Sequence, residues 1–380
     1  IYITGKGRCN VTNACDFEGL ISNQCRNGRF LYSAFRRFSN EDMCELLESA
    51  GCRLKTERGD RVFPVSDHAS DVTKALTRLL SETGVNIRLR TEVRSIEQLP
   101  EGGFALKAFD QEHRHTETFS CQKLIVATGG LSYPTTGSTG DGYRFARHFG
   151  LRVNDCLPSL VPMEVEELRE VSELSGLSLR NVVLSLYEGK KLLYKELGEL
   201  LFTHRGLSGP LVLTASSYAG ESMLSNGGSC DGLSLSIDLK PALSAEKLDA
   251  RLLRELDRAK NQDIKNVLRA LLPSSLILPV LGRAGLDPDR KANSVTREDR
   301  QRIGAVIKDL RYQVTGLGGF NEAVITKGGV DVKEIDPRTM ESKKVPGLYF
   351  AGEVLDLDAR TGGFNLQNSW STGYAAGVSA

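Results

Sequence analysis

The feature that most constrains this chain is a glycine-rich turn near its C-terminal end. Residues 347–353 have the sequence GLYFAGE, an apolar run that ends in glycine and an acid, and residues 359–367 have the sequence ARTGGFNLQ. The small residues from Ser371 to Ala380 then predict a helix. Glycine has no Cβ to keep a ligand from the backbone, and the first N–H groups of a helix attract negative charge. The turn therefore predicts a close backbone approach to a charged, elongated ligand.

A second strand that ends in glycines lies in the first half of the chain. Residues 124–130 have the sequence LIVATGG, a near-continuous apolar run that is typical of a parallel strand covered on both faces. A Gly-Gly pair taken alone is also typical of an ordinary turn, and this alternative stays open for either segment. The two strand ends together favour a nucleotide-binding, doubly wound α/β domain.

Composition excludes some classes of protein and limits others. The 380 residues include 49 basic and 48 acidic side chains, and this balance argues against a general nucleic-acid binder. No apolar run approaches the ~18 residues that span a bilayer. The eight cysteines form no C-x-x-C pair, so we predict reduced thiols, no metal site and a cytoplasmic protein. The first residue, Ile1, suggests that the chain begins inside a fold.

Hydrophobic periodicity places the elements of the first part of the chain. Helices are predicted from Asn40 as N-cap to Gly51, and from Asp67 along the apolar stripe of residues 72–80. Residues 85–89 predict a strand, and residues 93–96 and 104–108 predict two strands joined by the turn at 100–103. Residues 123–127 predict the buried strand described above.

The middle of the chain has a different pattern. Alternating apolar residues near 182–186 and 233–239 predict antiparallel strands, and two amphipathic helices are predicted from about Ser244 and from Asp263 to Pro273. We therefore predict an α/β domain in two parts, 1–157 and 322–380. It is interrupted by an inserted domain, 158–321, which is antiparallel β over 158–243 and helical over 244–321.

Five segments taken together resemble one family. They are GKGRCNVTN at 5–13, ATGGLSYPTTGSTGDG at 127–142, LFTHRGLSGP at 201–210, TKGGV at 326–330 and the C-terminal residues 352–367. This order of motifs is similar to the BaiN-like, or aminoacetone oxidase-like, NAD(P)/FAD-dependent oxidoreductases of bacteria. The resemblance implies a discontinuous, Rossmann-like FAD-binding domain of glutathione reductase type, with an inserted β-barrel-like piece and a small helical piece. The T-G-D-G and K-G-G-V segments also resemble fumarate reductase and aspartate oxidase flavoproteins.

One part of the family pattern does not appear in this sequence. Such proteins carry G-x-G-x-x-G after the first strand and a Glu at the end of the second, roughly 40 residues before Ile1 by the motif order. We therefore expect that the first βαβ segment of the domain is missing from the sequence as given.

The resemblance implies a set of FAD-binding residues. It places the loop of residues 5–13 around the flavin, Val93 at the adenine, and glycine-rich turns at the diphosphate, ribityl chain and flavin ring. Local alternatives stay open: Cys9 as a small buried residue, Val93 as an ordinary strand residue and Asp141 as a helix cap. The implied residues are Gly5, Gly7, Arg8, Cys9, Asn10, Thr12, Val93, Thr128, Gly129, Gly130, Gly140, Asp141, Gly352, Glu353, Gly362, Gly363, Phe364, Asn365 and Leu366.

The candidates for substrate chemistry lie in the predicted insertion. His204 offers a proton carrier near neutral pH and Arg205 a fixed cation, directly before a Gly-Pro pair. We predict His204 as acid or base and Arg205 as a clamp for a carboxylate or carbonyl group. The alternative is an exposed loop with no catalytic role.

These observations predict an FAD-dependent oxidoreductase that acts on a small molecule. The preferred reaction is NADH- or NADPH-linked reduction of an activated C=C or carbonyl-type compound. The alternatives are an FAD-dependent amine oxidase of an aminoacetone-like substrate and a flavin-binding protein without turnover. We predict no nucleic-acid or membrane partner, and the sequence leaves the oligomeric state open.

Overall fold

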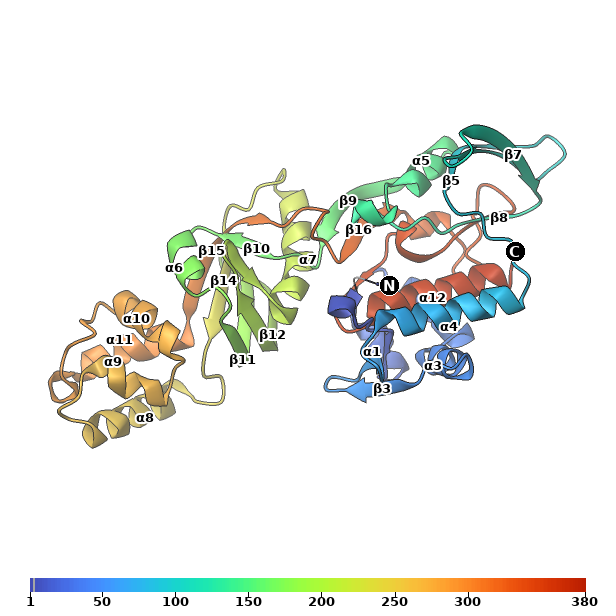
Figure 1. Cartoon of the computed structure of the whole chain (residues 1–380). Coiled ribbons are helices and arrows are strands. Elements are labelled where there is room, and N and C mark those ends of the chain that lie inside the picture. The colour runs from blue at the N-terminus through green and yellow to red at the C-terminus, as the bar shows by residue number, and fades with distance from the viewer. Residues whose placement is uncertain (3) are drawn as a thin grey trace. The chain divides into compact units, whose positions relative to one another are not determined.

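The chain forms two compact units. The computed structural model describes residues 1–2 and 4–380, and of Lys6 the backbone alone. The first unit joins Ile1–Pro158 to Phe320–Ala380, and the second is Ser159–Gly319 (Figure 1). Each unit has its own hydrophobic core.

The helices of the first unit begin where the sequence supplies caps. In α3, the Ser39 side chain accepts the N–H of Asp42, whose side chain accepts the N–H of Ser39, so two N–H groups without helical partners are satisfied. Asn40, the predicted cap, instead donates to the carbonyl oxygens of Asn13 and Cys15 at 2.6 and 2.9 Å. The helices are α1 Phe17–Ser22, α2 Tyr32–Arg37, α3 Asn40–Ser49, α4 Ala69–Glu82, α5 Asp141–His148 and α12 Phe364–Gly377.

The strands of the first unit are short and form five small sheets in the described residues. The two glycine-rich strand ends favoured a doubly wound α/β domain. Here the strands at the glycine-rich ends form a single parallel pair, Leu124–Val126 with Leu348–Phe350. The sheets are β1 Thr12–Asn13, β4 Arg61–Pro64 and β3 Leu54–Glu57; β5 Thr91–Gln98, β6 Phe104–Asp110 and β7 His115–Cys121; β8 Leu124–Val126 and β17 Leu348–Phe350; β9 Val153–Ser159 and β16 Ile325–Val330; β2 Gln24–Arg26 and β18 Asp358–Ala359.

A six-stranded closed barrel forms the centre of the second unit. Alternate residues of its strands are buried, as expected where one face of a strand lines a core. Helix α7, Pro210–Ser225, begins directly after its N-cap, Gly209. Proline suits the first helical position because an N–H group there would have no acceptor within the helix. The strand order is β10 Met163–Val165, β13 Gly206–Ser208, β12 Lys191–Phe202, β11 Ser178–Glu188, β14 Leu233–Asp238 and β15 Leu310–Leu317.

Short helices make up the remainder of the second unit. Leu248, Leu252 and Leu256 of α8 are buried, as the amphipathic pattern predicted, whereas Leu253, assigned to the same face, is 41% exposed. Helix α11 begins with a capping box formed by Thr296 and Asp299. The helices are α6 Leu168–Glu173, α8 Ala245–Arg258, α9 Ile264–Val267, α10 Ser274–Arg283 and α11 Arg297–Lys308.

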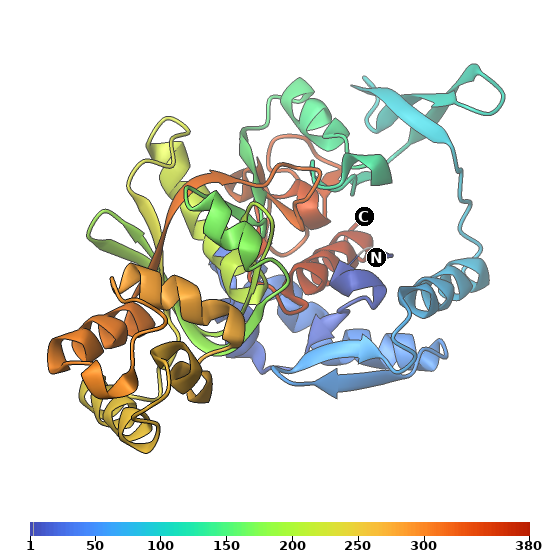
Figure 2. The same cartoon turned by 60° about the vertical axis from the view of Figure 1, so that its left-hand side comes forward.

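Several predicted elements differ from the structure. The strand predicted at 85–89 is wrong: Val85, Ile87 and Leu89 are 53%, 51% and 80% exposed in an irregular segment that joins α4 to β5 (Figure 2). An alternating pattern forms a strand only where a neighbouring strand supplies hydrogen bonds. The region 244–321 is not wholly helical, because β15 closes the barrel with Leu310, Tyr312 and Val314 buried.

Two helix boundaries were also wrong. The helix predicted from Asp263 to Pro273 is a single turn followed by a 3-10 turn, and the longer helix α10 begins after Pro273. The C-terminal helix starts at Phe364 rather than at Ser371, directly after the glycine turn. Of the helices in the described residues, each is too short or too polar to cross a lipid bilayer.

Candidate functional site

The two strand ends that contain the predicted glycines lie side by side. Strands β8 and β17 are parallel, with Leu124 opposite Leu348 and Val126 opposite Phe350. The backbone N–H of Ala351 donates to the carbonyl oxygen of Val126 at 3.1 Å. Parallel neighbours end at the same edge of a sheet, so the segments 127–130 and 351–353 come together, as at the ligand-binding edge of α/β folds.

A third segment, which begins β16, completes this edge. Oε1 of Glu353 accepts the backbone N–H of Thr326 at 2.8 Å, and Oγ1 of Thr326 accepts the N–H of Leu131 at 2.7 Å. A Cβ at Gly130 would lie 2.3 Å from that Oγ1 and 2.9 Å from the Glu353 oxygen, so only glycine fits. Thr326 was part of the K-G-G-V motif but was missed as a site residue, since a single threonine before glycines has no distinctive spacing.

Burial shifts the pKa of Glu353. Removal from water raises the pKa of this carboxyl group, and the hydrogen bonds from Thr326 and Ser132 oppose the shift. A carboxyl whose pKa is higher in the folded than in the unfolded chain stabilises the fold most when it is protonated. Stability is therefore lost as pH rises from the unfolded pKa through the folded pKa.

Replacing Glu353 with glutamine should make the flavin-free chain less sensitive to pH. Because Glu353→Gln removes the cost of the buried charge, its stability relative to wild type should be higher at pH 8 than at pH 5. Urea midpoints at the two pH values measure this difference. Glu97→Gln, at an exposed position of β5, is the matched control and should show little change. An equal effect of Glu353→Gln at both pH values would contradict the assignment.

The C-terminal glycine turn packs against the N-terminal loop. Nδ2 of Asn13 donates to the carbonyl oxygen of Gly362 at 3.0 Å, and Oγ1 of Thr12 donates to Oε1 of Gln367 at 2.6 Å. A Cβ at Gly363 would lie 2.3 Å from the carbonyl oxygen of Thr12. The structure thus brings together two predicted cofactor-binding segments from opposite ends of the sequence.

Helix α12 directs free N–H groups out of this turn. Its N-cap, Gly363, makes no side-chain cap bond, and the first turn contains no acidic residue. The N–H groups of Phe364, Asn365 and Leu366 therefore lack helical acceptors and carry the positive end of the helix dipole. The Asn365 side chain bonds both the N–H and the carbonyl oxygen of Ala359 at 2.9 Å, so it holds the turn in shape.

The N-terminal loop contains further predicted residues. Oδ1 of Asn10 is buried and has no hydrogen-bond partner within the described residues. Cys9 is fully buried, and burial raises the pKa of its thiol, which fits the alternative of a small core residue. Arg8 is occupied by acids: its Nε lies 2.8 Å from Asp67, and its Nη2 lies 2.5 Å from Glu57. Gly5 and Gly7 lie in the same 3-10 turn, Thr4–Gly7.

Helix α5 brings two more predicted segments together. Gly140 is its N-cap, and Asp141 is the first helical residue rather than the cap. Arg144 pairs with Asp141 at 2.9 Å and donates to the carbonyl oxygen of Arg94 at 2.6 Å, which places Val93 and β5 beside the start of α5. The turn 128–129 is also close, because a Cβ at Gly142 would lie 2.3 Å from Oγ1 of Thr128.

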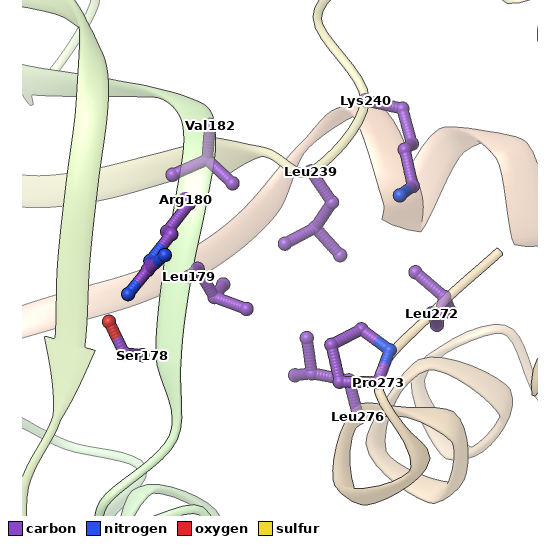
Figure 3. A pocket seen from close by; sticks show the side chains of 9 residues that line it. All are labelled: Ser178, Leu179, Arg180, Val182, Leu239, Lys240, Leu272, Pro273 and Leu276. Carbon is purple, nitrogen blue, oxygen red and sulfur yellow. The ribbon is translucent and has the colours of Figure 1, made fainter.

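The predicted catalytic pair lies in the second unit. His204 and Arg205 are exposed in the turn between β12 and β13, and Nη2 of Arg205 lies 2.6 Å from Oε1 of Glu164. Their catalytic role stays a prediction. A cavity of about 260 Å³ in the same unit is lined by none of the predicted site residues (Figure 3). Its lining is Ser178, Leu179, Arg180, Val182, Leu239, Lys240, Leu272, Pro273 and Leu276.

A buried ionic group near the C-terminal turn was not predicted. Nζ of Lys327 lies 3.7 Å from Oδ2 of Asp358, and both side chains are almost completely buried. Asp356 is buried beside them; burial raises the pKa of its carboxyl group, and Arg26 and Asn154 oppose the shift. The run LDLD at 355–358 would be typical of a half-exposed strand, so the sequence did not indicate that both acids are inside.

A family model decides the identity of the chain. The model of the HI0933-like protein Rossmann domain matches residues 1–379. The chain belongs to this family. Membership confirms the predicted flavoprotein family and the prediction of an enzyme, an FAD-dependent oxidoreductase of Rossmann type.

Three relatives of this HI0933-like protein have curated names. A ribosomal RNA dihydrouridine synthase of Escherichia coli is 35% identical over 99% of this chain and 87% of its own length. A protein of the same name from Haemophilus influenzae is 33% identical over 100% of this chain and 88% of its own length. A 3-dehydro-bile acid delta(4,6)-reductase of Clostridium scindens is 28% identical, with 100% and 89% covered.

The residues of the first unit fit an FAD cofactor. Three features of this unit offer polar groups to a ligand. They are the glycine turn at 362–363, the uncapped start of α12 and the buried side-chain oxygen of Asn10. Such groups suit a ligand with a diphosphate, hydroxyl groups and a polar ring edge. In the HI0933-like chain these groups lie at the strand ends and in the N- and C-terminal segments of the first unit.

Proposed function

We propose that the chain is an FAD-dependent reductase that adds hydrogen across a carbon–carbon double bond conjugated to a carbonyl group, with NADH or NADPH as electron donor. The single observation that carries the cofactor assignment is the uncapped start of α12, held against Thr12 by the Gly362–Gly363 turn. The relatives support the reaction, because a dihydrouridine synthase and a delta(4,6)-reductase both saturate a carbon–carbon double bond. When bound, FAD would supply the hydride.

The residues of the chain have separate roles in this proposal. The N–H groups of residues 364–366 would stabilise negative charge on the edge of the ring system, as an oxyanion hole does. Gly352 would let the diphosphate and ribityl chain approach the backbone, and Glu353 would accept a ribityl hydroxyl proton in a hydrogen bond. From the sequence alone, we propose that a ring nitrogen of His204 donates a proton to the substrate and that Arg205 holds its carbonyl oxygen.

The test of this function is anaerobic reduction and reoxidation of the flavin-loaded chain. NADPH or NADH should bleach the flavin absorbance, and an enone such as cyclohexenone or a uridine-containing RNA should restore it. Release of peroxide with aminoacetone, without reduction by NAD(P)H, would support the amine oxidase instead. Bound flavin without either reaction would support a non-catalytic protein.

Replacing the predicted proton donor and clamp should slow turnover and leave flavin content unchanged. His204→Ala and Arg205→Ala should each lower kcat/KM by about 10²-fold, the usual contribution of a positioned acid or cation. His148→Ala, at an exposed histidine of α5, is the matched control and should retain wild-type rates. Wild-type rates in His204→Ala would remove this residue from the mechanism.

A specific observation favours uridine in RNA as the substrate. The two relatives named for ribosomal RNA are more similar to this chain than the bile acid reductase, at 35% and 33% against 28% identity. Charge is also uneven, because residues 245–308 contain fourteen basic and nine acidic residues, and the remainder has an acidic excess. A local excess of basic residues would supply the phosphate attraction that RNA binding needs.

The two substrate classes can be separated directly. Mass spectrometry of ribosomal RNA should show that a dihydrouridine is absent from cells that lack the gene. Expression of the chain in those cells should restore it. In the anaerobic assay, RNA should reoxidise the flavin faster than a steroid enone, and this advantage should fall steeply with salt. Reoxidation by the enone alone, with unchanged RNA in cells, would favour a small-molecule reductase.

A further inference from the structure

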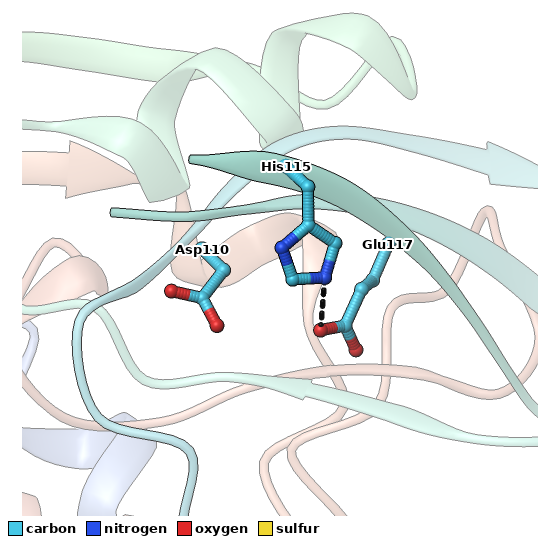
Figure 4. Close-up of side chains that lie close together, drawn as sticks. All are labelled: Asp110, His115 and Glu117. Atoms are coloured by element: carbon cyan, nitrogen blue, oxygen red, sulfur yellow. Dashed lines mark hydrogen bonds and ion pairs between the residues drawn. The ribbon is translucent and has the colours of Figure 1, made fainter. Parts of the chain in front are cut away.

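The hairpin of β6 and β7 gathers three side chains that can ligate a metal ion. Asp110 ends β6 and lies opposite His115, which begins β7. Glu117 lies two residues further along β7, and alternate residues of a strand share a face. Figure 4 shows the three side chains pointing toward one another, and their ligand atoms all lie within 4.8 Å of each other.

Local hydrogen bonds hold these side chains in place. Oδ1 of Asp110 accepts the backbone N–H groups of Glu112 and His113 at 2.8 and 2.9 Å, and Oδ2 lies 2.9 Å from Nδ1 of His113. Nε2 of His115 lies 2.8 Å from Oε1 of Glu117.

We propose that Asp110, His115 and Glu117 form a binding site for a divalent transition-metal ion such as Zn²⁺. One imidazole and two carboxylates are ligands that this class of ion accepts, with bonds of about 2.0–2.2 Å. Ligand atoms on one such ion are roughly 3.3–3.6 Å apart, so small side-chain rotations complete the site. His113 or a water molecule takes the fourth position.

A neighbouring arginine sets how tightly the site binds. Nη2 of Arg88 lies 2.7 and 2.8 Å from the two carboxylate oxygens of Glu117 and competes with the metal ion for them. We therefore expect moderate affinity in the wild-type chain and tighter binding when this competitor is removed. Arg88→Gln tests that expectation, because it keeps a polar side chain and removes the positive charge.

The experiment is a Co²⁺ titration of the untagged full-length chain followed by visible absorption, with Zn²⁺ as the competing ion. One Co²⁺ should bind per chain. Its visible absorption should be that of Co²⁺ held by nitrogen and oxygen ligands, without the charge-transfer band that cysteine thiolates give. His115→Ala should weaken binding at least about 10-fold, Arg88→Gln should strengthen it, and His148→Ala should leave it unchanged. The histidines of this hairpin are exposed, so these variants should fold normally.

Three outcomes would overturn the proposal. They are no saturable binding, thiolate bands in the Co²⁺ spectrum, and affinity that His115→Ala leaves unchanged. If the site binds, Zn²⁺ should also raise the unfolding temperature of the wild-type chain and not of His115→Ala, since a ligand specific for the folded state stabilises it.

Discussion

Replacing Gly363 with valine should abolish flavin binding and strongly destabilise the first unit. The backbone at Gly363 has φ +99°, which a β-branched residue rarely adopts, and a Cβ would lie 2.3 Å from the Thr12 carbonyl oxygen. Backbone strain and the collision together should cost about 3 kcal/mol or more. Flavin content per chain and urea unfolding measure the two effects.

A second glycine of the same helix is the matched control. Gly373 lies at an exposed position in α12, and a Cβ there meets no atom within 4 Å. Gly373→Ala should keep full flavin content and be neutral or more stable by about 0.5–1 kcal/mol, because alanine favours a helix interior. Wild-type flavin content in Gly363→Val would show that the turn does not contact the cofactor.

Replacing Lys327 with methionine should lower stability by about 3–5 kcal/mol, because it leaves the buried carboxylate of Asp358 without its cation. The two side chains are only 2% and 0% exposed, so water cannot replace the lost partner. The double variant Lys327→Met with Asp358→Asn should recover much of the loss. Thermal and urea unfolding of the wild type, the two single variants and the double variant form a double-mutant cycle, which gives the interaction energy of the Lys327–Asp358 pair.

An exposed ion pair of the same length provides the comparison. Nζ of Lys107 lies 3.6 Å from Oε1 of Glu97, and these side chains are 58% and 61% exposed. Lys107→Met should change stability by less than about 1 kcal/mol, since exposed pairs contribute little. If Lys327→Met lowered stability by equally little, burial would not explain the contribution of the Lys327–Asp358 pair to stability.

The glycines of the predicted cofactor-binding segments pointed to close backbone approaches, because glycine has a physical meaning at such positions. Gly130 and Gly363 each lie where a Cβ would collide with another segment, and these collisions join parts of the chain that no local pattern connects. The start of α12 was predicted seven residues too late, because the small residues after Ser371 have a stronger helical pattern than the aromatic and amide residues that begin it. The earlier start makes residues 364–366 the first turn of the helix, directly after the Gly362–Gly363 turn.

Other features depend on partners that are distant in sequence. Residues 85–89 alternate as a strand does but have no strand beside them, whereas residues 310–317 become a strand because β10 and β14 lie on either side. No local pattern indicated that Asp356 and Asp358 are buried, because the cations beside them come from other segments. The net charge of the whole chain likewise concealed the basic excess of residues 245–308.

The contact between Thr12 and Gln367 also determines when the cofactor site can form during synthesis. These residues are 355 positions apart. At roughly 5–20 residues per second, the N-terminal loop is made on the order of 18 to 70 s before its partner. The barrel and helices of residues 159–319 have their own core and can fold within that interval. The nascent first unit therefore holds an exposed, unpaired β8 until residues 348–367 emerge, and in that interval it depends most on protection from aggregation.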